Sequence, residues 1–268
     1  MVDAPWWNRR KRNRDGVSGV GASPVIKGDW RQRRREFQVS SASLVKVITL
    51  ILRRAGLLHE TYFGSDLVIG VFDTGIWPER QSFSGRDLGP VPAKWKGECV
   101  AGKSFPATSC NRKIIGARYF SEGYEATNGN LNETVEFSSA RDSNGHDTHT
   151  TSIAAGRYVS SASTLGYAKG FVAGMAPKAL LVVYKVCWLG ECYGSDILAA
   201  FDAAVDDDVD VVSLSVGGVV VSYHLNEIVI GAFGATSAGI FVSSSTSNGG
   251  HGGLTVTNVA PWVTTVDH

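Results

Sequence analysis

The feature that most constrains the fold is a series of short apolar runs that each end in small or polar residues. Residues 67–72 form one such run and lead directly into Asp73-Thr74-Gly75, and similar runs occupy 180–186, 209–216 and 239–243. Continuous apolar runs of this length are typical of strands buried on both faces of a parallel sheet. Residues 195–205, with Ser195 as the predicted N-cap, and residues 225–238 have helical apolar spacing. This alternation predicts an α/β fold, a parallel sheet flanked by helices.

Charge divides the chain into two segments. Residues 1–60 hold 13 basic and 5 acidic side chains, whereas the remaining residues hold 13 basic and 20 acidic ones. A change of sign this sharp predicts a basic extension over 1–60 and a globular part over 61–268. Arginine-rich clusters at 9–14 and 31–35 flank a stretch without periodicity, so we expect little stable structure before about residue 42. One short helix or strand is expected at 43–58.

The basic extension has two interpretations. The first is a solvated, disordered segment; the second is a nuclear-localisation or nucleic-acid-binding arm, because clustered cations attract phosphate. The first is favoured, and the extension is the one hint of a nucleic-acid partner. No signal peptide is visible in the chain, since no apolar segment stands near residue 1. No apolar run reaches about 18 residues, so we expect no membrane span.

The four cysteines form two close pairs in the sequence, Cys99 with Cys110 and Cys187 with Cys192. Ten and four intervening residues fit two local disulfides in an oxidising compartment, and free buried thiols are the alternative. The spacing is not that of a zinc ribbon, and we expect neither a metal nor a cofactor. Asn132 begins an Asn-Glu-Thr triplet, which is a candidate glycosylation site.

Three groups could perform chemistry where the predicted strands end. Asp73 could orient a histidine through the Nδ1–H group, or it could be a turn aspartate. His146 and His149 begin a small-residue segment that is expected to be a helix with both side chains on one side. Asn248 follows the last apolar run, and its amide could donate to an oxyanion or form an ordinary Asn-Gly turn. Sites in parallel sheets form at this edge.

Taken together, residues 64–268 resemble the subtilisin-like serine proteases, and specifically the plant-type subtilases. The resemblance rests on residues 65–79, 110–118, 141–149, 174–179, 184–188, 210–218 and 256–262, in the order of the family. It implies a subtilisin-like parallel sheet, C-terminally truncated here, and hydrolysis of peptide bonds in protein or peptide substrates. It also implies an extracellular or secretory location, and it supports the two disulfides.

The resemblance implies a role for each candidate residue. Asp73 matches the aspartate of the catalytic triad, His146 matches the general base, and Asn248 matches the oxyanion-hole asparagine. The substrate-binding positions match as well: Ser215, Val216 and Gly217 form the segment that pairs with an extended peptide, and Thr246 and Ser247 form a pocket wall.

Three departures from the family pattern matter. Asp147 stands where the family has glycine, and it could raise the pKa of His146 or draw the imidazole out of position. Thr246 and Ser247 replace alanine and glycine in the pocket wall. No Gly-Thr-Ser sequence follows Asn248, so the nucleophile of the family is absent from these residues. We therefore expect the chain as given to be inactive and not to react with a fluorophosphonate probe.

Two other functions remain as alternatives. A truncated subtilase could be a pseudoenzyme or could only bind peptides. The sequence Asp73-Thr74-Gly75 is also the signature of aspartic proteases, but their chemistry needs a second such aspartate, and none occurs.

Overall fold

The computed structural model describes residues 61–250, 252–253 and 255–266. The predicted basic extension over 1–60, together with the element expected at 43–58, lies outside the described residues. The structure therefore addresses the globular part of the chain.

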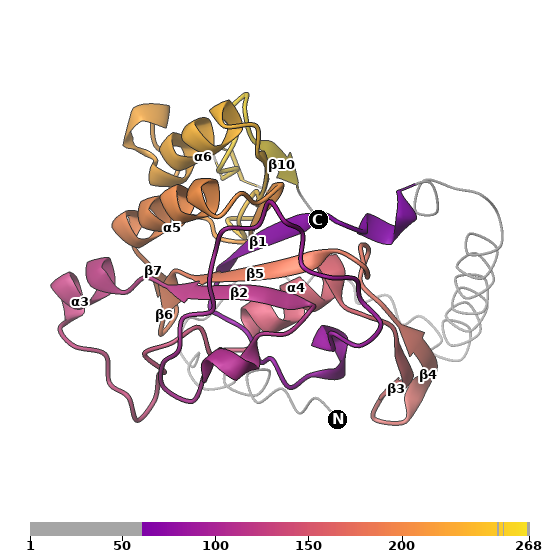
Figure 1. The fold of residues 1–268 in the computed structure, drawn as a ribbon. Helices are drawn as coiled ribbons and strands as arrows, with labels where there is room; N and C mark the ends of the chain where they lie inside the picture. The colour runs from indigo at the N-terminus through magenta and orange to yellow at the C-terminus, as the bar shows by residue number, and fades with distance from the viewer. Residues whose placement is uncertain (1–60, 251, 254, 267–268) are drawn as a thin grey trace, which may run out of the picture. The chain divides into compact units, whose positions relative to one another are not determined.

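A six-stranded sheet forms the centre of the main body, with strand order β10-β9-β8-β1-β5-β2 (Figure 1). Every pairing in it is parallel, which confirms the predicted α/β fold. The four predicted apolar runs all lie in this sheet. The strands are β1 (Val68–Asp73), β2 (Ile114–Tyr119), β5 (Leu180–Lys185), β8 (Val211–Leu214), β9 (Phe241–Ser245) and β10 (Thr264–Val266).

The edge strands β2 and β10 are not among the apolar runs predicted from the sequence. β2 contains Gly116 and Arg118, which interrupt its apolar pattern. A Cβ atom at Gly116 would lie 2.5 Å from the Trp95 ring, so close packing requires the glycine. The positive charge of Arg118 is balanced by Asp207. The guanidinium donates to both carboxylate oxygens of Asp207, at 2.9 and 2.8 Å. Tertiary contacts therefore stabilise a strand that has no clear pattern of its own.

Alternate residues of β1 point to opposite faces of the sheet and build two separate cores. Val68 and Phe72 pack with residues of α5 (Gly194–Asp206) and α6 (Glu227–Ser237), which contact each other along their length (Figure 1). Ile69 and Val71 pack on the other face, where Ala155 of α4 (His146–Ala155) joins the core. This is the period of two that a strand imposes. The shorter elements of the main body are η2 (Tyr62–Gly64), η3 (Gln81–Phe83), η4 (Ala107–Ser109), α3 (Glu122–Asn128), β6 (Cys187–Trp188), β7 (Glu191–Cys192) and η5 (Tyr223–Leu225).

Both predicted helices are present, but their starts differ from the prediction. Ser195 is not the N-cap of α5: Tyr193 holds that position with an extended backbone, and it makes no side-chain capping bond. The first turn instead directs Asp196 toward α3, whose Gly123 amide donates to the carboxylate at 2.7 Å. In α6 the N-cap is Asn226, whose side chain accepts from the amide of Val229 at 3.1 Å. A side-chain cap therefore marks the start of α6 but not that of α5.

The hairpin of β3 (Val159–Thr164) and β4 (Tyr167–Val172) is a separate feature, and its residues 161–170 do not belong to the main body. Leu165 and Gly166 connect the strands, and both have positive φ, 50° and 85°. This is the backbone geometry of a two-residue hairpin turn.

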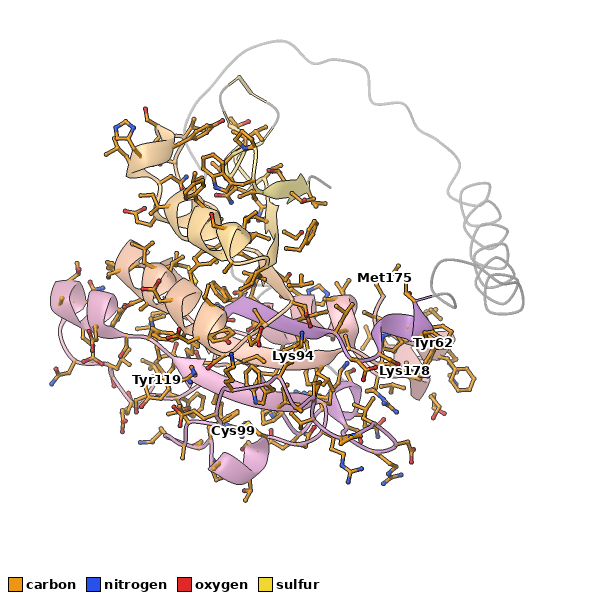
Figure 2. All side chains as sticks on the ribbon, turned by 45° about the horizontal axis from the view of Figure 1, so that its top comes forward. Tyr62, Lys94, Cys99, Tyr119, Met175 and Lys178 are labelled. Carbon is orange, nitrogen blue, oxygen red and sulfur yellow. A yellow bond between two sulfur atoms is a disulfide. The ribbon has the colours of Figure 1, made fainter. Side chains whose placement is uncertain are left out.

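The first described residues are held by the segment that precedes β5. The amide of Lys178 donates to the carbonyl of Phe63 at 3.0 Å, and Figure 2 shows Lys178 and Tyr62 at the same end of the molecule. Across the described residues, no helix has the length and apolar character needed to cross a membrane.

Candidate active site

Asp73 is the last residue of β1 and lies buried at the carboxyl edge of the sheet. The flanking strands β5 and β8 are parallel to β1, so their ends reach the same edge. The amide of Thr74 donates to Asp73 Oδ1 at 2.8 Å. A carboxylate in this position can interact with groups that follow any of the three strands, as the sequence predicted for sites in such sheets.

His146 is the partner of Asp73. It is the first residue of α4, and its Nδ1 atom lies 2.7 Å from Asp73 Oδ2. The hydrogen bond with Asp73 raises the pKa of His146 above its ordinary value, burial opposes this, and the charges of Asp73 and Asp142 add to it. The imidazole is 47% exposed, so it is accessible from solvent while Nδ1 is occupied. With Nδ1–H donating to the carboxylate, Nε2 is the nitrogen that can accept a proton.

Ser215 makes a second contact with the same carboxylate oxygen. It follows β8 directly, and its hydroxyl donates to Asp73 Oδ2. The sequence assigned Ser215 to the substrate-binding segment, whereas the structure adds a side-chain contact with the Asp73–His146 pair. The adjacency follows from the register, in which Phe72 lies opposite Leu214. That register cannot be read from the sequence alone.

Asp142 is a site residue that the sequence did not single out. One of its oxygens accepts from the amides of Asn144 and Gly145, at 3.0 and 2.7 Å, and the other accepts from the amide of Thr148 at 3.1 Å. The hydroxyl of Thr74 also donates to it at 3.1 Å. The carboxylate therefore caps the start of α4 and ties it to the residue after Asp73. An aspartate just before a helix start is the signal that could have identified it.

Asp147 is fully buried beneath the first turn of α4. It accepts hydrogen bonds from the amide of Gly75 at 3.2 Å and from the hydroxyl of Thr151 at 2.5 Å. Burial raises the pKa of Asp147 well above its ordinary value, and the charge of Asp73 adds to this. The buried carboxyl thus holds its proton more tightly than an exposed aspartate does. The Asp73–His146 contact is present alongside it, so the side chain is accommodated without displacing the imidazole.

The segment after β9 carries the other predicted site residues. Thr246 is buried, and Ser247, with a positive φ of 72°, lies directly against Gly217. A Cβ atom at Gly217 would lie 2.2 Å from that of Ser247, so the two segments are in close contact. Asn248 is exposed beyond them, and its side chain makes no hydrogen bond with another described residue. Its side chain is therefore accessible to solvent.

Asn258 holds these two segments together. Its buried Nδ2 atom donates to the carbonyls of Val216 and Ser245, at 3.0 and 2.9 Å, and to the hydroxyl of Ser244 at 2.9 Å. Val216 follows β8 and Ser245 ends β9. One side chain therefore fixes the spacing of the two segments on which the predicted substrate-binding residues lie.

A buried ion pair supports the loop that leads into α4. Lys185, the last residue of β5, donates to Glu136 at 2.7 Å and to the carbonyl of Arg141 at 2.8 Å. Burial lowers the pKa of Lys185, and the charge of Glu136 opposes this. Glu136 also accepts from Ser143 at 2.7 Å. Both sides of the Asp142 loop are thereby fixed to the sheet.

Both predicted disulfides are confirmed: Cys99 bonds to Cys110 and Cys187 to Cys192. The alternative of free thiols is wrong, because no cysteine in the described part of the chain is free. Within that same part of the chain, no cluster of three histidine, cysteine, aspartate or glutamate side chains could hold a metal ion.

A buried aspartate that holds a helix-start histidine at the carboxyl edge of a parallel sheet has the geometry of the acid–base half of a hydrolase site. The sequence model described as the subtilase family matches residues 64–266. The chain belongs to the subtilase family, whose members are serine-type endopeptidases. Asp73 is paired with a histidine rather than with a second aspartate, so the aspartic protease alternative is wrong.

The most similar relatives include subtilisin-like proteases from Arabidopsis thaliana. SBT1.5 is 70% identical over 213 residues, which cover 80% of this chain and 28% of the relative. SBT1.6 is 52% identical over 257 residues, covering 94% of this chain and 33% of the relative, so that alignment includes part of the basic segment before residue 61. The chain thus spans about a third or less of the length of these relatives. A solved structure, the prenylagaramide maturation protease PagA, matches with 14% identity and a TM-score of 0.41 over 72% of this chain and 50% of that chain.

Proposed function

We propose that this chain supplies the acid–base pair and the oxyanion donor of a serine endopeptidase. The observation that carries the proposal is the 2.7 Å contact between Asp73 Oδ2 and His146 Nδ1. The aspartate selects the tautomer with hydrogen on Nδ1, so His146 Nε2 takes the proton of a serine hydroxyl as that oxygen attacks a peptide carbonyl. The side-chain amide of Asn248 donates to the oxyanion that forms.

The substrate is an extended peptide. It pairs with the backbone of Ser215, Val216 and Gly217, in the manner of a strand added at the edge of a site. The contact of Ser247 with Gly217 supports a narrow passage between the two walls, because a side chain occupies space that glycine in the family pattern leaves open.

The nucleophile is proposed to come from outside these 268 residues, since no Gly-Thr-Ser sequence follows Asn248 within them. The 268-residue polypeptide alone is then expected to stay unlabelled by a fluorophosphonate probe. Fusion to the part of SBT1.5 that follows the aligned region is expected to restore labelling, and His146→Ala in the fusion is expected to abolish it. Labelling of the 268-residue chain alone would contradict the missing nucleophile, and labelling of the His146→Ala fusion would contradict the role of the base.

We also propose that the protein matures in the secretory pathway. Two disulfides support an oxidising compartment. Asn132 is exposed, and its side chain accepts from the amide and the hydroxyl of Thr134, at 3.1 and 2.7 Å, so the triplet forms a surface turn. Digestion of plant-expressed protein with a peptide N-glycosidase is expected to lower its apparent mass, and Asn132→Gln is expected to remove that shift. An unchanged mass would contradict glycosylation at this residue.

A further inference from the structure

The carboxylate of Asp73 is stabilised by hydrogen-bond donors rather than by a lysine or arginine. Among the described residues, neither of these cation types pairs with it. Thr74 donates to Oδ1, whereas Oδ2 contacts both His146 Nδ1 and the hydroxyl of Ser215. Two donors therefore share the one oxygen that governs the protonation of His146.

We propose that Ser215 is a positioning residue for the Asp73–His146 pair, an inference that rests on the proposed function. A donor to a carboxylate oxygen stabilises the ionised carboxylate and reduces its remaining strength as an acceptor. The hydroxyl thereby limits how strongly Asp73 favours the imidazolium form of His146. A general base must be neutral to take a proton, so this limit keeps His146 available at a lower pH.

The hydroxyl is held in place by the sheet rather than by a mobile loop. β8 pairs with β1 in a register that sets Leu214 opposite Phe72. The next residues are Asp73, the last of β1, and Ser215, the first after β8. The carbonyl of the following residue, Val216, accepts from Asn258 at 3.0 Å. The residues on both sides of Ser215 are thus held in place. Ser215 connects the acid–base pair with the segment that is proposed to bind the peptide.

The other charged or titratable groups around His146 belong to residues that Ser215→Ala does not change. Asp73 faces it from β1 and Asp142 from the loop before α4, and both charges raise its pKa. Asp147 and His149 lie on its own helix. Lys185, at the end of β5, interacts with Asp142 and Asp147. Replacing the Ser215 hydroxyl leaves all of these groups in place, so a change in the His146 pKa reports on the hydroxyl.

The test is an NMR titration of the histidine ring protons in the full 268-residue chain, with His146 assigned by comparison with His146→Gln. In Ser215→Ala, the pKa of His146 is expected to rise by about 0.5–1 unit. The free energy that corresponds to this rise is smaller than that of one hydrogen bond to a charged group. Ser215→Thr keeps a hydroxyl and is expected to restore the wild-type value. Ser213→Ala, on the same strand, is the matched control and is expected to change nothing.

An unchanged or lower pKa in Ser215→Ala, or equal shifts in Ser215→Ala and Ser213→Ala, would overturn the proposal. Asp73→Asn separates this failure from failure of the proposed function, because removing the carboxylate must lower the pKa of His146 if the two residues are paired. If Asp73→Asn has no effect, the pair itself fails. If Asp73→Asn lowers the pKa of His146 while Ser215→Ala leaves it unchanged, only the proposed role of Ser215 is contradicted. Ser215→Cys replaces Ser215→Ala if that variant does not fold, with the same rise expected.

Discussion

Asp147 shows how an acidic residue can occupy a position that the subtilase pattern reserves for glycine. Its carboxyl lies beneath the helix start and bonds to Gly75 and Thr151. The sequence predicted a disturbance of His146, because it places the two residues side by side and gives no direction for the side chain. In the structure the carboxyl instead joins the turn after Asp73 to the helix, and burial raises its pKa.

At the residue scale, Asp147→Asn is expected to stabilise the protein increasingly as the pH rises. The folded pKa is raised, so the folded state holds the proton more tightly than the unfolded chain, whose pKa is about 4. Wild-type stability from this group is present below that pH and is lost as the pH rises through the folded pKa, whereas asparagine has no proton to lose. Urea unfolding between pH 5 and pH 8 measures the difference.

Asp202→Asn is the control for this prediction, because Asp202 is exposed on α5. It is expected to show no such widening difference. A constant difference in unfolding free energy between Asp147→Asn and wild type across the pH range would contradict the raised pKa of Asp147.

At the scale of elements, α4 is positioned by a carboxylate that precedes it. The helix has glycine at its N-cap, which offers no side chain, and Asp142 supplies the missing acceptor from three residues earlier. The same carboxylate accepts from Thr74, so the helix start and the end of β1 share one polar centre. The sequence could predict the helix from its histidines and small residues, but not this cap, because the cap depends on how the loop folds back.

Asp142→Ala is expected to lower the free energy of unfolding by about 1–3 kcal/mol, since it removes a cap and leaves three part-buried amide hydrogen bonds without their acceptor. Chemical denaturation measures this loss. Asp202→Ala is the matched control and is expected to lie within about 0.5 kcal/mol of wild type. A loss for Asp142→Ala no larger than that of the control would show that the cap contributes nothing.

At the scale of the whole molecule, the sheet separates two cores and gathers the site at one edge. The apolar runs and the helices between them were enough to predict the parallel sheet and the edge at which Asp73 lies. Strand β2 was not predicted because Gly116 and Arg118 interrupt its apolar pattern. The hydrogen bonds from Asn258 to Val216 and Ser245 were not predicted because they join segments that are far apart in sequence. The strand register decides which atoms of neighbouring strands come into contact, and the pattern of apolar residues does not specify it.

The two disulfides act on the stability of this whole unit. They close loops with sequence separations of 11 and 5 residues, and loss of loop-closure entropy in the unfolded chain predicts about 2–3 kcal/mol for each. Replacing either pair by serines is expected to lower the urea midpoint by a corresponding amount. A midpoint unchanged by both replacements would show that the bridges do not constrain the unfolded chain.

The residues that the strand register brings together at Asp73 also have a defined place in the order of synthesis. Asp73, His146 and Ser215, together with the strands β1, β5 and β8 that align them, all lie between residues 68 and 215. Synthesis proceeds from the N-terminus, and domains generally fold as units during synthesis. Asp73, His146 and Ser215 are therefore translated before Asn248, the proposed oxyanion donor. The residues of the proposed proton acceptor are thus all synthesised before the residue proposed to stabilise the oxyanion.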